Sequence, residues 1–237
     1  MLFRSLEYLD ALAAEAAGDP ILQAELALAY QKVGDVQGNP VGGNLGDSAG
    51  ALSSYRRAMT ILEQIKPRTN AVRKDLANTY YKIGAVQGQT GATAESLKSY
   101  RKAESLAEEL LAANPSHETL RTLAGVYDAS SRTLGALGDI EPSLVATNRA
   151  ILIVKRLVAA NPGDDDLLHD LSSFQGTLAT QLPRVGRLAE GLEAARQAVA
   201  LREELVRRHP NDLRYLRNLM IAWSHVGDCL ALPSRPN

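Results

Sequence analysis

Residues 76–115 read LANTYYKIGAVQGQTGATAESLKSYRKAESLAEELLAANP, and this stretch decides the fold. In its first part Leu76 and Tyr80 are four residues apart, with a small residue directly after the leucine, which is the spacing of one helical face. In its second part Leu97 and Ala103 are six residues apart, with a tyrosine between them. The proline that ends the stretch cannot continue a helix. The stretch therefore predicts two helices followed by a stop.

Similar stretches recur along the chain. Their terminal prolines are separated by 47, 48, 47 and 48 residues, at Pro20, Pro67, Pro115, Pro162 and Pro210. The first pattern is anchored at Leu26, Leu76, Leu123, Leu171 and Leu219. The second is anchored at Leu52, Leu97, Leu144 and Leu192, and six residues after each anchor comes Ala58, Ala103, Ala150 or Ala198. Self-similarity at a fixed period of this length predicts a solenoid, in which each repeat packs on its neighbours.

The composition favours packed helices over sheets. Hydrophobic residues make up 45% of the 237 residues and charged residues 22%, while aromatic residues make up only 5%. The net charge of -1 removes the usual electrostatic argument for a nucleic-acid or anionic membrane partner. The longest clean aliphatic run, residues 151–154, is far shorter than the ~20 residues that span a bilayer. A single cysteine, Cys229, excludes an intramolecular disulfide and suits a reducing compartment, so we expect a cytoplasmic protein.

The two patterns resemble the tetratricopeptide repeat (TPR), whose first helix carries Leu, a small residue and Tyr, and whose second carries Ala, an aromatic residue and Ala. The matching residues are Leu76, Ala77, Tyr80, Ser96, Tyr100, Ala103 and Pro115 in one repeat, and Leu26, Ala27, Tyr30, Ala51, Tyr55, Ala58 and Pro67 in the repeat before it. The period exceeds the family's usual length of about 34 residues by about 14. That surplus is close to two extra turns in each helix, which leave its buried face unchanged. The resemblance implies an all-α, right-handed solenoid of antiparallel helix pairs.

We expect one solenoid domain over residues 1–237. Its predicted parts are a half repeat at 1–18, repeats at 19–66, 67–114, 115–161 and 162–209, and a C-terminal capping helix and tail at 210–237. The first helix, about residues 2–17, looks like the second helix of a missing repeat. This suggests a fragment or C-terminal segment of something longer, and it offers a surface through which copies of the chain could form a homo-oligomer.

A narrower resemblance covers roughly residues 5–115, including the strings LALAYQKVGDVQGNP at residues 26–40 and LANTYYKIGAVQGQTG at residues 76–91. They are similar to the repeat-bearing C-terminal regions of some bacterial serine/threonine protein kinases. The resemblance implies a possible parent protein and no activity of this chain, because the His-Arg-Asp, Asp-Phe-Gly and Gly-rich-loop motifs of a kinase are absent. A regulatory or self-association tail of such a kinase is therefore the alternative function.

The sequence contains no pattern typical of a catalytic or metal site. The glycine-rich stretch 38–46 lacks the Gly-Lys-Ser/Thr of a phosphate loop and is interpreted as a turn. Residues 164–166 are three aspartates without the spacing of a calcium loop, which favours an acidic first helical turn. The histidines show no metal-ligand spacing, and Cys229 is interpreted as an inert apolar residue. We therefore expect no enzyme activity, cofactor or metal.

In TPR proteins the first helices line a concave groove, and the resemblance carries this role to specific positions. The predicted groove residues are Lys74, Asn78, Tyr81 and Lys82 in the second repeat, Arg121, Asp128 and Arg132 in the third, and His169 in the fourth. Such groups can stack on and hydrogen-bond an extended peptide or a partner helix. The alternatives are that these polar side chains are only solvated and bind no partner, or that a partner binds through the convex face or the chain ends.

Two of these residues, Lys74 and Asn78, occupy positions of the carboxylate clamp with which some family members bind a peptide's C-terminus. The other clamp positions hold Thr122, Asp166 and Asp170, of which the aspartates would repel a carboxylate. We therefore reject a full clamp. The sequence predicts a non-enzymatic scaffold that binds a protein or peptide.

Overall fold

The computed structural model describes residues 2–16, 18–39, 43–113 and 115–231, and all regular structure in those residues is helical. The helices are α1 (Leu2–Glu15), α2 (Pro20–Gly38), α3 (Ser48–Gln64), α4 (Asn70–Gln89), α5 (Thr93–Ala113), α6 (His117–Leu137), α7 (Ile140–Ala160), α8 (Asp165–Gln181), the short 3-10 helix η1 (Leu182–Val185), α9 (Leu188–Arg208) and α10 (Leu213–Ala231). The middle of the glycine-rich stretch, 40–42, and the predicted tail, 232–237, lie outside the described residues.

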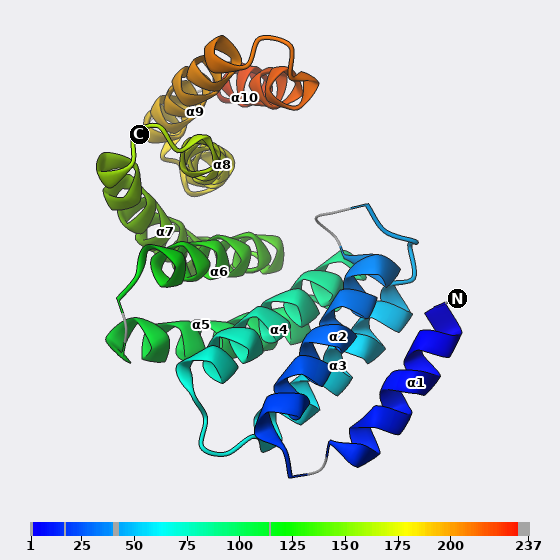
Figure 1. Ribbon diagram of the computed structural model, residues 1–237. Helices are drawn as coiled ribbons and strands as arrows, with labels where there is room; N and C mark the ends of the chain where they lie inside the picture. The colour runs from blue at the N-terminus through cyan, green and yellow to red at the C-terminus, as the bar shows by residue number, and fades with distance from the viewer. Residues whose placement is uncertain (1, 17, 40–42, 114, 232–237) are drawn as a thin grey trace. The chain divides into compact units, whose positions relative to one another are not determined.

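The chain divides into two compact units, residues 1–119 and 120–237, and each is described by itself. In the first unit α2 packs against α3, α4 packs against α5, and α3 joins the two pairs by packing on α4; α1 lies on α2 (Figure 1). In the second unit α8 packs against α9, with α7 and α10 on either side of this pair in the chain. Two α-helices therefore lie between each proline of the 47–48-residue series and the next.

Polar side chains cap the helices that begin after two of the series prolines. The hydroxyl of Ser116, directly after a series proline, accepts a hydrogen bond from the backbone N–H of Thr119 at 3.1 Å. Asp164 accepts one from the N–H of Leu167 at 3.1 Å and forms the N-cap of α8. Such side chains satisfy N–H groups that have no partner inside the helix. Pro20 differs from the other series prolines, because it is the first residue of α2.

The buried residues confirm the sequence periodicity. Ala58, Ala103, Ala150 and Ala198 are each 0% exposed. The leucine anchors of α2, α4, α6 and α8 are also buried. Close helix packing requires a small side chain at the point where the two backbones approach, and alanine supplies it without losing side-chain entropy.

The last helix, α10, has one buried and one exposed apolar face. Ala222, Val226 and Cys229 are buried, and α10 packs on α9 and α8. Apolar side chains are also exposed on the helix, including Met220 and Trp223, the latter 52% exposed. A terminal helix that caps a solenoid usually presents a polar outer face. The predicted capping helix thus carries an exposed apolar surface where a capping helix is usually polar.

Candidate functional site

The first-helix surface of the N-terminal unit is organised around Asp35 of α2 and Lys82 of α4. The Lys82 ammonium donates to both carboxylate oxygens of Asp35 at 2.7 Å and lies 5.6 Å from the centre of the Tyr55 ring. The Tyr55 hydroxyl donates to Asp35 Oδ1 at 2.7 Å. Burial, and then this hydrogen bond, raise the pKa of Tyr55, so the phenol stays protonated. The Lys82 ammonium is therefore held in place by groups from two other helices.

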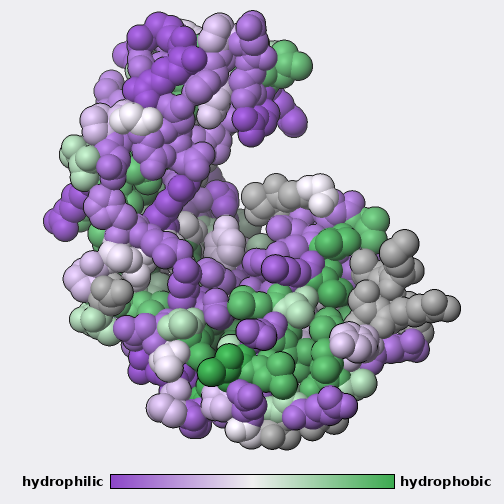
Figure 2. All heavy atoms as spheres, viewed as in Figure 1, coloured by the Kyte–Doolittle hydropathy of each residue, from purple (hydrophilic) through white to green (hydrophobic). Residues whose placement is uncertain are grey.

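The other predicted residues of α4 extend this surface along the helix. Lys74 Nζ lies 2.5 Å from Glu118 Oε1, and the rings of Tyr81 and Tyr100 meet with centroids 5.7 Å apart. Lys74, Asn78, Tyr81 and Lys82 are all half-buried. Figure 2 shows apolar surface on the face of the first unit that is turned to the viewer. On α2 the exposed apolar side chains are Ile21, Leu28 and Val36.

In the C-terminal unit, Arg121 of α6 bridges to α8. Its Nε lies 3.0 Å from Asp170 Oδ2, and its Nη1 lies 3.4 Å from Asp166 Oδ2. These two aspartates occupy the positions where a carboxylate clamp would need basic residues. In the structure each is paired with Arg121, so the arrangement is an internal ion-pair network on the surface of this unit.

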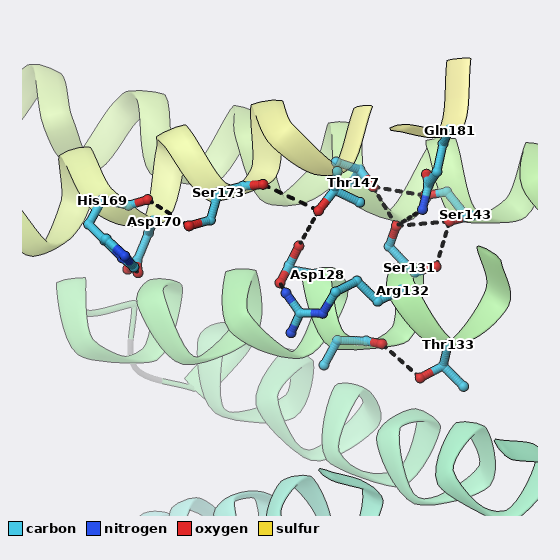
Figure 3. A network of polar contacts seen from close by, with 12 residues as sticks. Asp128, Ser131, Arg132, Thr133, Ser143, Thr147, His169, Asp170, Ser173 and Gln181 are labelled. Atoms are coloured by element: carbon cyan, nitrogen blue, oxygen red, sulfur yellow. Dashed lines mark hydrogen bonds and ion pairs between the residues drawn. The ribbon is translucent and has the colours of Figure 1, made fainter. Parts of the chain in front are cut away.

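Asp128 and Arg132 form the next polar group along α6 (Figure 3). The Asp128 side chain is only 5% exposed, is ion-paired with Arg132 and accepts a hydrogen bond from Thr177 Oγ1 of α8 at 3.3 Å. Burial raises the pKa of Asp128 above its ordinary value although Arg132 opposes the shift. Because the carboxylate is enclosed, Asp128 positions Arg132 and Thr177, whereas the Arg132 side chain itself is exposed.

The last predicted residue, His169, connects α8 to α10. Its Nε2 lies 3.2 Å from the side-chain nitrogen of Asn218. Its backbone carbonyl accepts hydrogen bonds from the hydroxyls of Ser172 and Ser173, at 2.8 and 3.0 Å. The eight predicted residues therefore fall into two sets, one in each unit, and each set is tied into its unit by polar contacts between helices.

The C-terminal unit also contains a cleft of ≈ 470 Å³, which the groove prediction reached through Arg132 but did not describe as a site of its own. Its lining includes Arg132 of α6, Ser173 and Gly176 of α8, Arg184 of η1, Arg202 of α9 and His225 of α10. The sequence interpretation did not include Arg184 and Arg202. Arg184 follows the end of the helical pattern, and Arg202 comes from a second helix, whereas the groove prediction used first helices only.

The residues described by the structure hold no group of three or more His, Cys, Asp or Glu side chains placed to bind a metal ion. Cys229 is buried, and burial raises the pKa of its thiol, as expected for an unreactive side chain. None of the described helices combines the length and the apolar character needed to cross a bilayer.

No protein-family model matches the chain, and no curated protein matches it. Solved structures do match. BtubC (BKLC) from P. vanneervenii is 17% identical and superposes with a TM-score of 0.67 over 97% of this chain and 84% of that chain. A putative kinesin light chain from Podosopora anserina, described as nearly identical TPR-like repeats, is 16% identical, with a TM-score of 0.54 over 87% of this chain and 86% of that one.

The yeast histone chaperone Hif1 is 11% identical, with a TM-score of 0.50 over 99% of this chain and 96% of that one. At such low identity these matches show the fold alone. They confirm the predicted all-α solenoid of TPR-like helix pairs.

Proposed function

We propose that the chain is a non-enzymatic scaffold that binds a protein or peptide through the first-helix surfaces of its repeats. A shared fold does not set a function, so the proposal rests on the surface residues. Hif1, which has a similar fold, is described as a scaffold protein that recruits protein complexes to core histones. For this chain the observation that carries the proposal is the half-buried row of cationic and aromatic groups on α4.

This row has the properties of a recognition surface. The Lys82 ammonium is already ordered by Asp35, so a ligand that contacts it causes little loss of side-chain entropy. The half-buried Tyr81 ring packs against Tyr100, with centroids 5.7 Å apart, so less of its side-chain freedom remains to be lost on binding. Tyrosine is a frequent binding hot spot, and the lysines add a charge that can select an acidic partner. In the C-terminal unit, Arg132 and His169 are proposed to contact the ligand, and the enclosed Asp128 positions Arg132.

The test compares two double variants of the full chain as baits in extracts of the native host. Lys74→Ala with Tyr81→Ala removes one cation and one ring from the proposed surface. Lys102→Ala with Tyr8→Ala removes one cation and one ring from exposed positions elsewhere, and serves as the matched control. A specific partner should be retained by the wild type and the control, and its recovery should fall at least tenfold with the α4 variant.

The partner found in this way is then titrated against each variant. Tyr81→Ala should cost ~1 kcal/mol or more of binding free energy if the ring is an anchor. Melting curves must accompany the titration, because Tyr81 also contacts Tyr100. Equal affinity for the wild type and both variants would place the binding surface elsewhere.

A second candidate function is self-association, which the exposed stripe on α10 favours; that the chain is the tail of a bacterial serine/threonine protein kinase remains the proposal made from the sequence resemblance. Its members recur at intervals of three, four, three, four and three residues: Leu213, Leu216, Met220, Trp223, Gly227 and Leu230. This order of intervals is the same in both directions, so two antiparallel copies of α10 would match every member with another. The occupant of the stripe in this proposal is a second copy of the chain, with Arg214 near Asp228 of that copy.

Light scattering over a concentration series tests self-association. We expect a dimer that Trp223→Glu converts to a monomer, whereas Leu152→Glu, at an exposed leucine of α7, leaves it intact. A monomer at every concentration would contradict the proposal. A dimer insensitive to Trp223→Glu would instead favour the half repeat at α1. A kinase reading frame directly upstream in the host genome would support the link to a kinase.

A further inference from the structure

The cleft in the C-terminal unit contains a buried cation without an acidic partner. Arg202 is 6% exposed, and its guanidinium donates to the Ser172 hydroxyl at 3.3 Å and to the Asn218 carbonyl at 2.5 Å. Among the described residues no carboxylate is paired with it. Burial lowers the pKa of Arg202. An arginine in such surroundings is costly to the folded state, because its charge has lost water without gaining a counter-charge.

Two further arginines line the same cleft. Arg184 donates from Nη1 to the Gly135 carbonyl at 2.8 Å, which leaves other N–H groups of its guanidinium for a ligand. Arg132 is ion-paired with Asp128. Three guanidinium groups therefore line the cleft, and the carboxylate of Asp128 offsets one of them. The charge of the cleft is positive although the net charge of the whole chain is -1.

Gly176 and His225 lie beside each other in the lining of the cleft. A Cβ atom at Gly176 would lie 3.5 Å from His225 Nδ1 and 3.9 Å from Arg202 Nη2, so a larger side chain there would fill the space between these two groups. His225 Nδ1 is buried and has no hydrogen-bond partner among the described residues. Burial, and then the charge of Arg202, lower the pKa of His225, whereas Asp228 opposes the shift. The cleft therefore presents a buried guanidinium and an unpartnered imidazole nitrogen to the same space.

We propose that this cleft binds an oxyanion, namely a carboxylate or a phosphate group. Guanidinium groups recognise both with paired, charge-assisted hydrogen bonds. The bound anion would supply the counter-charge that Arg202 lacks, and a protonated His225 would donate to it from Nδ1. None of the positions of the carboxylate clamp takes part, and Arg202 comes from a second helix. The proposed oxyanion site can therefore be tested separately from the proposed binding surface on α4.

The experiment measures thermal unfolding of the full chain against rising concentrations of inorganic phosphate or acetate, with chloride holding the ionic strength constant. A ligand that binds only the folded state raises the melting temperature. We compare the wild type with Arg202→Met, which removes the buried charge, and with Arg196→Met, an exposed arginine of the same helix that loses the same charge. At least one anion should stabilise the wild type and Arg196→Met saturably, and half-saturation should need at least tenfold more anion in Arg202→Met.

A second measurement tests the proposal even if the Arg202→Met variant does not fold. Gly176→Leu fills the cleft without changing charge, and Gly125→Leu, at a glycine with no atom near its Cβ position, is its control. NMR titration of the His225 ring should show a higher pKa with the anion present, because a nearby negative charge favours the imidazolium. Gly176→Leu should abolish this increase, and Gly125→Leu should retain it.

Comparing phosphate with acetate distinguishes a phosphate ligand from a carboxylate ligand. Comparing a short peptide that has a free C-terminus with the same peptide amidated tests whether the carboxylate comes from a chain end. A preference for phosphate or for the free carboxylate supports the proposal and names the group. Stabilisation that chloride reproduces, or that is equal in Arg202→Met and Arg196→Met, overturns it. An unchanged His225 pKa at saturating concentrations of every probe also overturns it.

Discussion

Gly34 and Tyr55 approach so closely that a Cβ atom on the glycine would lie 2.6 Å from Cε1 of the ring. Gly84 and Tyr100 repeat this relationship in the next helix pair, where the corresponding distance is 2.8 Å. In the third pair, Ser131 and the hydroxyl of Thr147, at 2.5 Å, replace the glycine and the ring. The point where a first helix meets its second helix is therefore filled in two different ways, by a ring on a glycine or by a hydrogen-bonded hydroxyl pair.

Replacing Gly84 with alanine tests this packing. The added methyl group would overlap the buried Tyr100 ring, and overpacking of this kind costs ~1–3 kcal/mol of the free energy of unfolding. Gly125→Ala is the control, because no atom lies within 4 Å of its Cβ position. That variant should gain up to ~1 kcal/mol from helix propensity alone. Urea unfolding measures both, and a Gly84→Ala variant as stable as Gly125→Ala would contradict the packing described above.

Overpacking of the second helices gives another prediction. Ala103 is 0% exposed, so Ala103→Phe should destabilise the fold by ~1–3 kcal/mol. Lys102→Phe, one residue earlier and exposed, should change stability by no more than ~0.5 kcal/mol. The difference between the two melting curves reports the register of α5. A reversed order of the two variants would mean that the helix is rotated from the described position.

The apolar spacing of the sequence was enough to predict the buried leucine and alanine positions such as Leu76 and Ala103, because burial in a helix repeats every turn, but it did not single out Gly34 or Gly84. The polar contacts between helices were not predicted, because predicting them requires a comparison of residues about one repeat apart. Asp35 and Lys82 are 47 residues apart, Asp128 and Thr177 are 49 apart, and Arg121 and Asp170 are also 49 apart. These separations are close to the 47–48-residue repeat. Stacking of equivalent helices brings residues one period apart into contact, so a comparison of charged and hydrogen-bonding residues at this offset could have predicted the pairs.

Other site residues could not be predicted in this way. Arg202 bonds to Ser172 across 30 residues, a separation that matches no multiple of the repeat. Its burial depends on the pairing of a second helix with the first helix before it, and on the absence of a side chain at Gly176. The sequence pattern showed the glycine at a first-helix position and offered no reason to connect it with an arginine on α9.

The Asp35–Lys82 pair offers a direct measurement of coupling between two repeats. Both side chains are mostly buried, and the ammonium lies near both carboxylate oxygens. A double-mutant cycle with Asp35→Ala and Lys82→Ala should give a coupling energy of about 1 kcal/mol, because the pair is better shielded than a fully exposed one. The same cycle with Lys74 and Glu118, a more exposed pair, should give less. Equal values for the two cycles would show that burial adds nothing to the first pair.

The pH dependence of stability should report on His225. Because the pKa of His225 is lowered in the folded chain, the unfolded chain takes up a proton near the ordinary value of about 6.5, before the folded chain does. Stability contributed by the neutral ring is therefore complete above that pH and decreases as the pH falls toward the lowered pKa. His225→Gln has no such proton to bind. The wild type should lose stability relative to His225→Gln between about pH 7.5 and about pH 5.5 in urea unfolding, since the contributions of the carboxylates are common to both proteins. Relative stability that stays constant over this range would show that folding does not shift the pKa of His225, and a relative gain for the wild type at the lower pH would show that folding raises it; either result would contradict the prediction.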